Sequence, residues 1–298
     1  MLFLNLRDMI VLFHKITNIF WKLLPDDLFI IIKYYYRLRR IPNLKNPISF
    51  TEKMQWLKLY NRKPIMTQMV DKYAAKQLVA SIVGEQYIIP TLGVWDNPYE
   101  IDFEKLPNQF VLKCTHNSGG LIICRDKSSL DIKTSLKKLQ NSLKGDYFYC
   151  NREWPYKNVK KRIIAEQFME EKGKNDLIDY KFFCFNGVPK YCQVIRDRNT
   201  KETIDFYDMN WNHQEFVGLN PKVRNGVTPV AKPKQLDEMI CICEKLATVS
   251  PFTRVDLYSI NNKVYFGEIT FYPATGMGVF TPSEWNYKLG NMIDLTLV

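Results

Sequence analysis

The chain has 298 residues, of which 46% are hydrophobic, and its formal net charge is +11. This length accommodates about two domains, and this hydrophobic fraction is ample for a buried core, so a disordered chain is excluded. Seven cysteines are an odd number in a chain too large to need stapling, which favours buried free thiols in a reducing compartment over a disulfide framework. The three histidines are too scattered along the sequence for a zinc site of the usual spacing.

The basic excess is concentrated near the beginning of the sequence. Residues 1–63 hold 12 Lys/Arg against 4 Asp/Glu, a surplus of 8. Lys15 and Lys22 interrupt the segment MIVLFHKITNIFWKLLPDD, so it is too polar for a membrane span, and it lacks the cleavage site of a signal peptide. It predicts an amphipathic helix that either docks on the protein's own core or lies on a membrane surface. Nucleic acid is a less favoured partner, because no base-reading module accompanies the basic residues.

Two helices are predicted in the next part of the chain. SFTEKMQWLKLYNR begins with a capping-box pattern, at Ser49 or Thr51, and continues with an apolar face of period 3.6. PIMTQMVDKYAAKQLVASIVG predicts a second helix, which begins near Pro64 and ends at Gly84.

Short β-rich runs dominate the sequence from Phe110 onward. Two helical stretches, around residues 128–143 and 234–249, interrupt them, and Asn186-Gly187 and Asn261-Asn262 indicate antiparallel hairpins. The predicted fold class is therefore α+β. The runs are FVLKC, LIIC, RIIAEQFM, DYKFFCF, PKYCQVI, TIDFYD, FTRVDLY and KVYFGEITF.

Lys113 lies inside the apolar run FVLKC, which is followed by His116-Asn117-Ser118-Gly119-Gly120. A buried ammonium needs a counter-charge, which a phosphate would supply. The glycines would also let backbone N–H groups turn toward the same anion. The loop has neither the Walker nor the Rossmann spacing, so a simple hairpin with Lys113 on its edge is the alternative interpretation.

Two strand-like runs near the C-terminus carry carboxylates. Alternation places Arg254 and Asp256 on one face of the first run, and Glu268 and Thr270 on one face of the next. An odd-length loop, such as Asn261-Asn262-Lys263, would set Asp256 directly opposite Glu268. Like charges repel across a ladder, so the pair predicts a divalent cation, with Mg²⁺ favoured. The alternative is an exposed face on which both carboxylates are solvated. A two-residue loop would also shift the pairing, so that Asp256 and Glu268 would no longer lie opposite each other.

Charged residues interrupt two further apolar runs. Glu166 follows the part of the run RIIAEQFM that is predicted to be buried. Asp179 and Lys181 share one face of DYKFFCF. The last two residues either form a cross-strand ion pair or offer an acceptor to a sugar hydroxyl and a donor to a phosphate.

These motifs, in this order, resemble the ATP-grasp superfamily, and in more detail its teichuronopeptide-biosynthesis (TupA-like) branch, which is found among capsule and cell-surface polysaccharide genes. The resemblance covers nearly the whole chain. It implies an ATP-grasp fold, with two α+β subdomains that grip ATP and a helical N-terminal extension. The implied segments are a basic N-terminal region at 1–63, an N-terminal part of the module at 64–109, a central lid subdomain at 110–163 and a C-terminal subdomain with the magnesium site at 164–298. The motifs that carry the resemblance are LPDDLFIIIKYYYRLRR, NPISFTEKMQWLKLYNR, DKY, IIPTLGVWD, FVLKCTHNSGG, DYKFFCFNG, DFYD, RVDLY and GEITFYPATG.

The resemblance also implies roles for individual residues at the nucleotide. Lys113 matches a lysine that touches the phosphates, and the loop with Ser118, Gly119 and Gly120 matches a flap over them. Asp179 would lie near the ribose and Lys181 near the phosphates. The hinge that holds adenine would be formed by Glu166, Gln167, Phe168 and Met169.

At the metal, Asp256 and Glu268 match the magnesium-binding acids, and Arg254 matches an arginine that steadies the transferred phosphoryl group or the acyl intermediate. Thr270 stands where many relatives have Asn, so a hydroxyl would replace an amide oxygen. His116 would act on the phosphoryl group or stabilise its loop. Arg196 and Arg198 are both candidates for a further phosphate contact.

The implied activity is that of a cytoplasmic carboxylate–amine ligase that uses ATP and Mg²⁺. ATP would phosphorylate a carboxylate to an acylphosphate, and an amine would displace the phosphate. The expected carboxylate is a hexuronic acid of a surface polysaccharide, and the expected amine is an amino acid. The alternatives are a glycosyltransferase, which would consume a nucleotide-sugar and release no ADP, and a non-catalytic membrane-docked assembly protein that works through KYYYRLRR.

Overall fold

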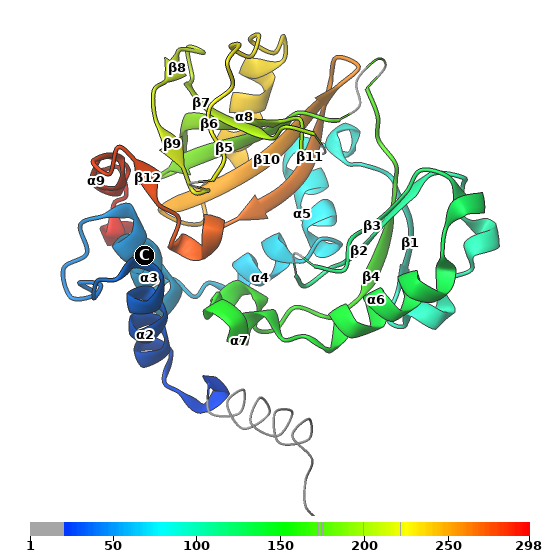
Figure 1. The fold of residues 1–298 in the computed structure, drawn as a ribbon, viewed down its shortest axis with the longest axis horizontal. Helices are drawn as coiled ribbons and strands as arrows, with labels where there is room; N and C mark the ends of the chain where they lie inside the picture. The colour runs from blue at the N-terminus through cyan, green and yellow to red at the C-terminus, as the bar shows by residue number, and fades with distance from the viewer. Residues whose placement is uncertain (1–20, 118, 172, 174–175, 199, 221) are drawn as a thin grey trace, which may run out of the picture.

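Two antiparallel sheets form the two lobes of the molecule (Figure 1). The computed structural model describes residues 21–117, 119–171, 173, 176–198, 200–220 and 222–298. The small sheet has the strand order β1 (Thr91–Trp95), β4 (Ile163–Gln167), β2 (Phe110–Cys114) and β3 (Ile122–Cys124). The large sheet has the order β11 (Lys263–Thr270), β10 (Phe252–Ile260), β5 (Asp179–Phe185), β6 (Val188–Arg196), β7 (Thr203–Asp208) and β8 (His213–Gln214). Strands β12 (Phe280–Thr281) and β9 (Val217–Gly218) pair separately.

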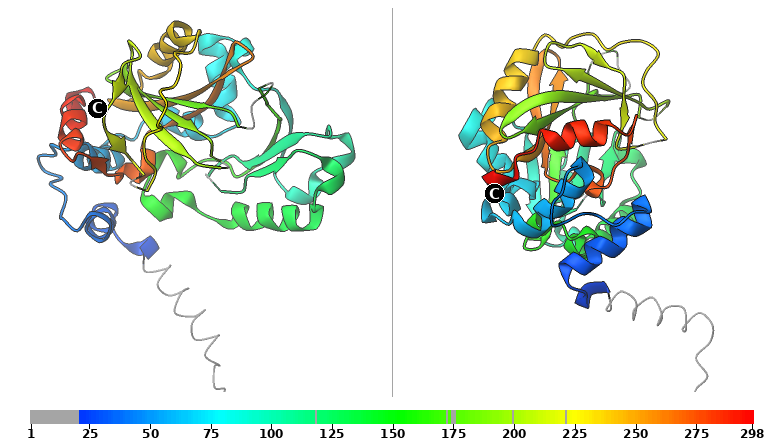
Figure 2. Two further views of the ribbon diagram at one scale, coloured as in Figure 1. Left: turned by 45° about the horizontal axis from the view of Figure 1, so that its top comes forward. Right: turned by 90° about the vertical axis from the view of Figure 1, so that its left-hand side faces the viewer.

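Helices surround the two sheets (Figure 2). They are α2 (Asp26–Leu38), α3 (Phe50–Tyr60), α4 (Pro64–Val70), α5 (Ala74–Val83), α6 (Ile132–Lys144), α7 (Tyr147–Asn151), α8 (Leu236–Leu246) and α9 (Trp285–Asn291). The α+β prediction is confirmed, and each of the eight predicted β-rich runs contains a strand.

Each sheet has its own hydrophobic core. The smaller core contains residues from Ile101 to Ala165, and α6 contributes Leu139 to it. The larger core joins residues 50–79 to residues 159–293. Phe50 illustrates this junction, because its ring packs edge-on against Phe252 at 5.0 Å and Phe280 at 5.7 Å. The four-segment division of the chain stays a prediction; in space, α3, α4 and α5 belong with the large sheet.

The helix predicted from SFTEKMQWLKLYNR is confirmed. Helix α3 begins with a capping box, in which Ser49 and Glu52 exchange hydrogen bonds between side chain and backbone. The second is wrong as a single helix, because α4 ends at Val70 and α5 begins at Ala74. Asp71 lies at the break in an extended conformation, and its Oδ1 accepts hydrogen bonds from the N–H groups of Tyr73 and Ala74 at the start of α5.

The hairpin between β10 and β11 places Asp256 opposite Glu268, as expected, but through a different loop. The turn contains two residues, Asn261 and Asn262, rather than three, because both adopt a positive φ, of 51° and 60°. A β-bulge then shifts the register between Asp256 and Leu257, and Gly267 is the extra residue on β11. The bulge restores the pairing that the short turn would have displaced by one residue.

The N-terminal region reaches the rest of the molecule through buried polar contacts. Most of the predicted amphipathic helix in residues 9–27 lies outside the described residues, which begin at residue 21. Arg152, 1% exposed, pairs with Asp26 at 2.9 Å and lies over the ring of Phe29. Within the described part of the chain, no helix is both long enough and apolar enough to cross a membrane.

All seven cysteines are free, and Cys150 and Cys241 are exposed, so the prediction of burial is wrong for these two.

Candidate active site

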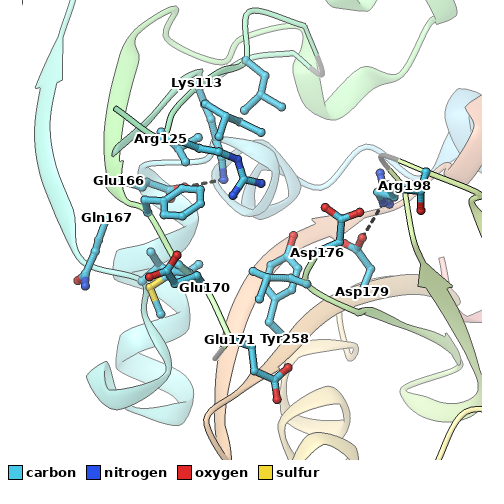
Figure 3. Close-up of a pocket in the computed structure, with 18 residues that line it drawn as sticks. Lys113, Arg125, Glu166, Gln167, Glu170, Glu171, Asp176, Asp179, Arg198 and Tyr258 are labelled. Carbon is cyan, nitrogen blue, oxygen red and sulfur yellow. Dashed lines mark ion pairs between the residues drawn. The ribbon is translucent and has the colours of Figure 1, made fainter. Parts of the chain in front are cut away.

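A cavity of about 930 Å³ opens between the two sheets (Figure 3). One wall comes from β2, β3 and the end of β4, and the other from β5, β10 and the segment after β6. Lys113, Arg125 and Glu166 lie on the first side in Figure 3, while Asp179 and Arg198 lie on the second.

Lys113 projects into this cavity, and its counter-charge is a carboxylate of the neighbouring strand. Its Nζ lies 2.5 Å from Oε2 of Glu166, which sits diagonally across the β2–β4 ladder. The other oxygen of Glu166 lies 2.6 Å from Nζ of Lys76, on α5. Burial alone would raise the pKa of Glu166, but the two lysines outweigh it and lower that pKa. One carboxylate between two ammonium groups leaves a surplus positive charge at the cavity wall, which suits a phosphate.

A second charge cluster lies at the junction of β5, β10 and β11. Arg254 donates from Nε to Asp256 at 2.6 Å, and from Nη2 to Glu268 at 3.2 Å and Thr270 at 3.0 Å. Lys181 donates to the other oxygen of Asp256, and lies 3.5 Å from Asp179. The predicted faces of these strands are therefore the observed ones, and each charged member of the cluster is near an opposite charge.

Lys72 brings a further cation to this cluster, and the sequence did not indicate it. It occupies the break between α4 and α5, where its Nζ donates to the carbonyl oxygen of Asn117 at 2.6 Å. The surrounding protein partly desolvates Glu268, although its side chain is 44% exposed, and this would raise its pKa; Lys72, Lys181 and Arg254 outweigh that effect and lower the pKa to about 2. Glu268 thus stays ionised at every physiological pH.

Asp256 and Glu268 provide carboxylate oxygens, the kind of ligand that Mg²⁺ prefers. Asp256 is 2% exposed and already bound by two cations, whereas the side chain of Glu268 is 44% exposed. Among the described residues, no group of three or more His, Cys, Asp or Glu could hold a metal by itself. Mg²⁺ commonly binds one or two carboxylates and takes its other ligands from phosphates and water, so this donor set suits a metal–nucleotide complex.

The structure separates the two arginines that the sequence left as equal candidates. Arg198 lines the cavity, where its Nε lies 2.8 Å from Asp179. Arg196 points elsewhere, to Asp205 at 3.2 Å and to the carbonyl oxygen of Thr228 at 2.7 Å. Asp197, with φ of 54°, breaks the alternation between them. Of the two arginines, only Arg198 lines the cavity.

The segment proposed to hold adenine lines the cavity from Glu166 to Glu171. Arg125 stacks over the ring of Phe168, with 5.0 Å from the guanidinium carbon to the ring centroid. The N–H of Gln167 already donates to the carbonyl oxygen of Pro90 at 3.0 Å. The N–H of Gln167 is therefore already occupied. Recognition of adenine by the other backbone groups of this segment stays a prediction.

The loop after β2 is packed against α6. His116 is 2% exposed, burial lowers its pKa, and it does not line the cavity. Asn117 donates to Oγ of Ser142 at 3.0 Å, and Gly120 has a positive φ of 62°, where a Cβ would clash with the side chains of Ser142 and Cys114. Ser118 lies outside the described residues and Gly119 is exposed. A flap role for this loop stays a prediction.

The molecule has two lobes, each built on an antiparallel sheet, and a cavity between them that is lined by lysine and carboxylate side chains. This is the arrangement of an ATP-grasp protein. The chain belongs to the TupA-like ATP-grasp family, whose model, described as TupA-like ATPgrasp, matches residues 52–294. No curated protein matches the chain.

Solved structures similar to this chain include ligases. D-alanine–D-alanine ligase from Bacillus anthracis, complexed with ATP, is 16% identical, with a TM-score of 0.44, over 77% of this chain and 65% of that one. D-cycloserine synthetase DcsG is 13% identical, with a TM-score of 0.43, over 78% of this chain and 72% of that one. The chain thus spans less than two thirds of the length of the first of these proteins.

Proposed function

We propose that this protein is an ATP-dependent carboxylate–amine ligase that binds ATP with Mg²⁺ in the cavity between its sheets. The observation that carries the proposal is the convergence on one cavity of Lys113 and Arg198 from opposite walls, beside the cluster of Arg254, Asp256 and Glu268. Cations that bind phosphate and carboxylates that hold a metal are the parts that phosphoryl transfer needs.

Each group has a role in the proposed reaction. Lys113, with Lys76 behind Glu166, binds the α- or β-phosphate. A substrate carboxylate oxygen attacks the γ-phosphorus, the bond to ADP breaks, and an acylphosphate forms. Arg254 and Lys181 stabilise the negative charge that develops on the transferred group. Asp256 and Glu268, with the Thr270 hydroxyl beside them, would hold Mg²⁺, which neutralises phosphate charge when it is bound.

The second half of the reaction forms the amide. The amine nitrogen attacks the acyl carbon, the bond to phosphate breaks, inorganic phosphate leaves and the nitrogen loses a proton. Exclusion of water from the cavity during the reaction would protect the acylphosphate from hydrolysis. We take the carboxylate to be a uronic acid of a capsular or cell-surface polysaccharide and the amine to be an amino acid. A peripheral contact of the basic N-terminal region with the inner membrane surface completes the proposal.

The test supplies ATP, Mg²⁺ and a panel of uronic acids with amino acids, and traps acylphosphate with hydroxylamine. We expect ADP and a hydroxamate with the correct acid. Lys113→Met should weaken ATP binding by about tenfold or more, since a charge-assisted contact to phosphate is lost. Lys160→Met, which removes a lysine on the surface, is the matched control and should bind ATP normally.

Two results would contradict the ligase proposal. One is the absence of ADP with every pair of substrates together with unchanged ATP affinity in Lys113→Met. The other is consumption of a nucleotide-sugar without ADP, which would identify a glycosyltransferase.

A further inference from the structure

One face of helix α2 is apolar and exposed. Leu28, Ile32, Tyr35 and Tyr36 repeat at helical spacing and therefore share a face. Leu28 is 43% exposed, Tyr35 51% and Tyr36 69%, and Ile32 is half-buried. We call these four residues the α2 face.

The opposite side of the helix is occupied by the rest of the protein. Phe29, Ile30 and Tyr34 are buried, and the Tyr34 hydroxyl is 2.9 Å from Oγ1 of Thr51. Burial of that side fixes the orientation of α2, so the α2 face is presented outward by the fold. Its apolar side chains need a partner that the described part of the chain does not supply.

Exposed apolar residues continue beyond both ends of the helix. Leu23, before α2, is 78% exposed, and Ile41, after it, is 71% exposed. Helix α2 lies at the edge of the molecule away from the small sheet, whose strands form one wall of the nucleotide cavity (Figure 2). A surface that binds there leaves the cavity open.

The surroundings of the α2 face are basic. Residues 21–63 hold 10 Lys/Arg against 3 Asp/Glu; of the basic residues, Lys58 is buried and Arg62 is paired with Asp26. Arg37, Arg39 and Lys45 are exposed on the helix or in the loop that follows it. A second copy of the chain docked on this face would bring like charges together, which opposes self-association. An anionic partner is favoured instead.

We propose that the α2 face docks on an anionic lipid surface. Leucine and isoleucine would enter the boundary between headgroups and acyl chains, the two tyrosines would lie at headgroup level with their hydroxyls in water, and the arginines would contact lipid phosphates. This proposal specifies the peripheral membrane contact of the proposed function and is independent of the ligase chemistry.

The test measures co-sedimentation of the full-length protein with vesicles. Vesicles of phosphatidylcholine with phosphatidylglycerol should bind it, vesicles of phosphatidylcholine alone should bind it weakly, and salt should release it. Tyr36→Ser should reduce binding to the anionic vesicles by about fivefold. Tyr99→Ser is the matched control, because Tyr99 is 68% exposed at a distant site, and it should bind as the wild type does.

Three results would overturn the proposal. They are no binding to anionic vesicles, equal binding to neutral vesicles, and equal loss in Tyr36→Ser and Tyr99→Ser. A concentration-dependent dimer that Tyr36→Ser dissociates would assign the α2 face to a second copy. ATP affinity measured on the same Tyr36→Ser protein should be unchanged, so failure of lipid binding and failure of nucleotide binding are separate results.

Discussion

Glu153 is a buried carboxyl group whose Oε1 accepts no hydrogen bond from the described residues. Burial raises its pKa to about 7, although Lys58 and Lys33 oppose this. Lys58 is also fully buried, and burial lowers its pKa to about 8. Both groups thus shift toward their neutral forms, as expected for ionisable groups removed from water.

The raised pKa of Glu153 makes stability depend on pH. Between its unfolded pKa of about 4.5 and its folded pKa of about 7, the folded protein holds more protons than the unfolded chain. Its contribution to stability is therefore full below this window and is lost as pH rises through it, by at most about 1.4 kcal/mol per pH unit. Glu153→Gln should remove this slope, so its stability relative to wild type should increase between about pH 5 and about pH 7. Urea unfolding at both pH values measures the effect.

The control is Glu244→Gln, which changes an exposed glutamate on α8 and should leave the slope as it is. Parallel pH dependence in wild type and Glu153→Gln would show that Glu153 does not titrate in this window.

Sequence reasoning at the level of single residues succeeded where alternation along a strand decides which way a side chain points. The shared faces of Arg254 with Asp256 and of Glu268 with Thr270 are examples. It missed Lys76 and Lys72, because a lysine in a helical pattern is ordinarily a solvated surface residue. Only the arrangement of the elements in space shows that Lys76 pairs with Glu166 and that Lys72 is close enough to Glu268 to lower its pKa.

The register of the β10–β11 hairpin shows what sequence can and cannot fix at the level of an element. Hydrophobic alternation identifies the strands and their faces, but the pairing also depends on turn length and on bulges. The two-residue turn and the bulge at Gly267 compensate one another, so the expected pairing of Asp256 with Glu268 was right although the expected loop was wrong. The bulge has no signal in the alternation pattern, since a glycine within a strand has several explanations.

The turn itself gives a prediction. Asn262 has a φ of 60°, which β-branched residues adopt only with strain. Asn262→Val should lower the free energy of unfolding by about 1–2 kcal/mol, measured by urea denaturation. The control Asn262→Gly should be at least as stable as wild type, because glycine enters this conformation freely. Equal losses in the two variants would mean that the asparagine side chain, rather than the backbone conformation, matters.

At the scale of the whole molecule, Arg152 joins the N-terminal region to the segment after α7. Its guanidinium donates to the carbonyl oxygens of Trp21 at 2.7 Å and Leu24 at 3.1 Å, in addition to its ion pair with Asp26. The same carboxylate binds Arg62 at 2.8 Å, whose side chain is 35% exposed. The two arginines on this aspartate therefore differ in burial and in the backbone carbonyl groups of Trp21 and Leu24, which only Arg152 binds here.

This difference can be measured. Arg152→Met should lower the free energy of unfolding by about 3 kcal/mol and speed hydrogen exchange in residues 21–38, because buried carbonyl groups lose their donor. Arg62→Met should cost less than about 1 kcal/mol, as expected for a half-exposed ion pair. ATP affinity should be unchanged in both. Equal effects of the two substitutions would show that burial does not determine the strength of this junction.

The assignment of residues to the two cores has a consequence for synthesis on the ribosome. The buried residues of the smaller core lie within residues 101–165 and its sheet within residues 91–167, so this sheet can form once β4 has emerged. Phe50 of α3 can be packed only much later in synthesis, because its ring contacts Phe252 and Phe280. Throughout that interval the apolar side of α3 is exposed to the cytosol of the translating cell, and a chain stalled before residue 252 presents a binding site for chaperones.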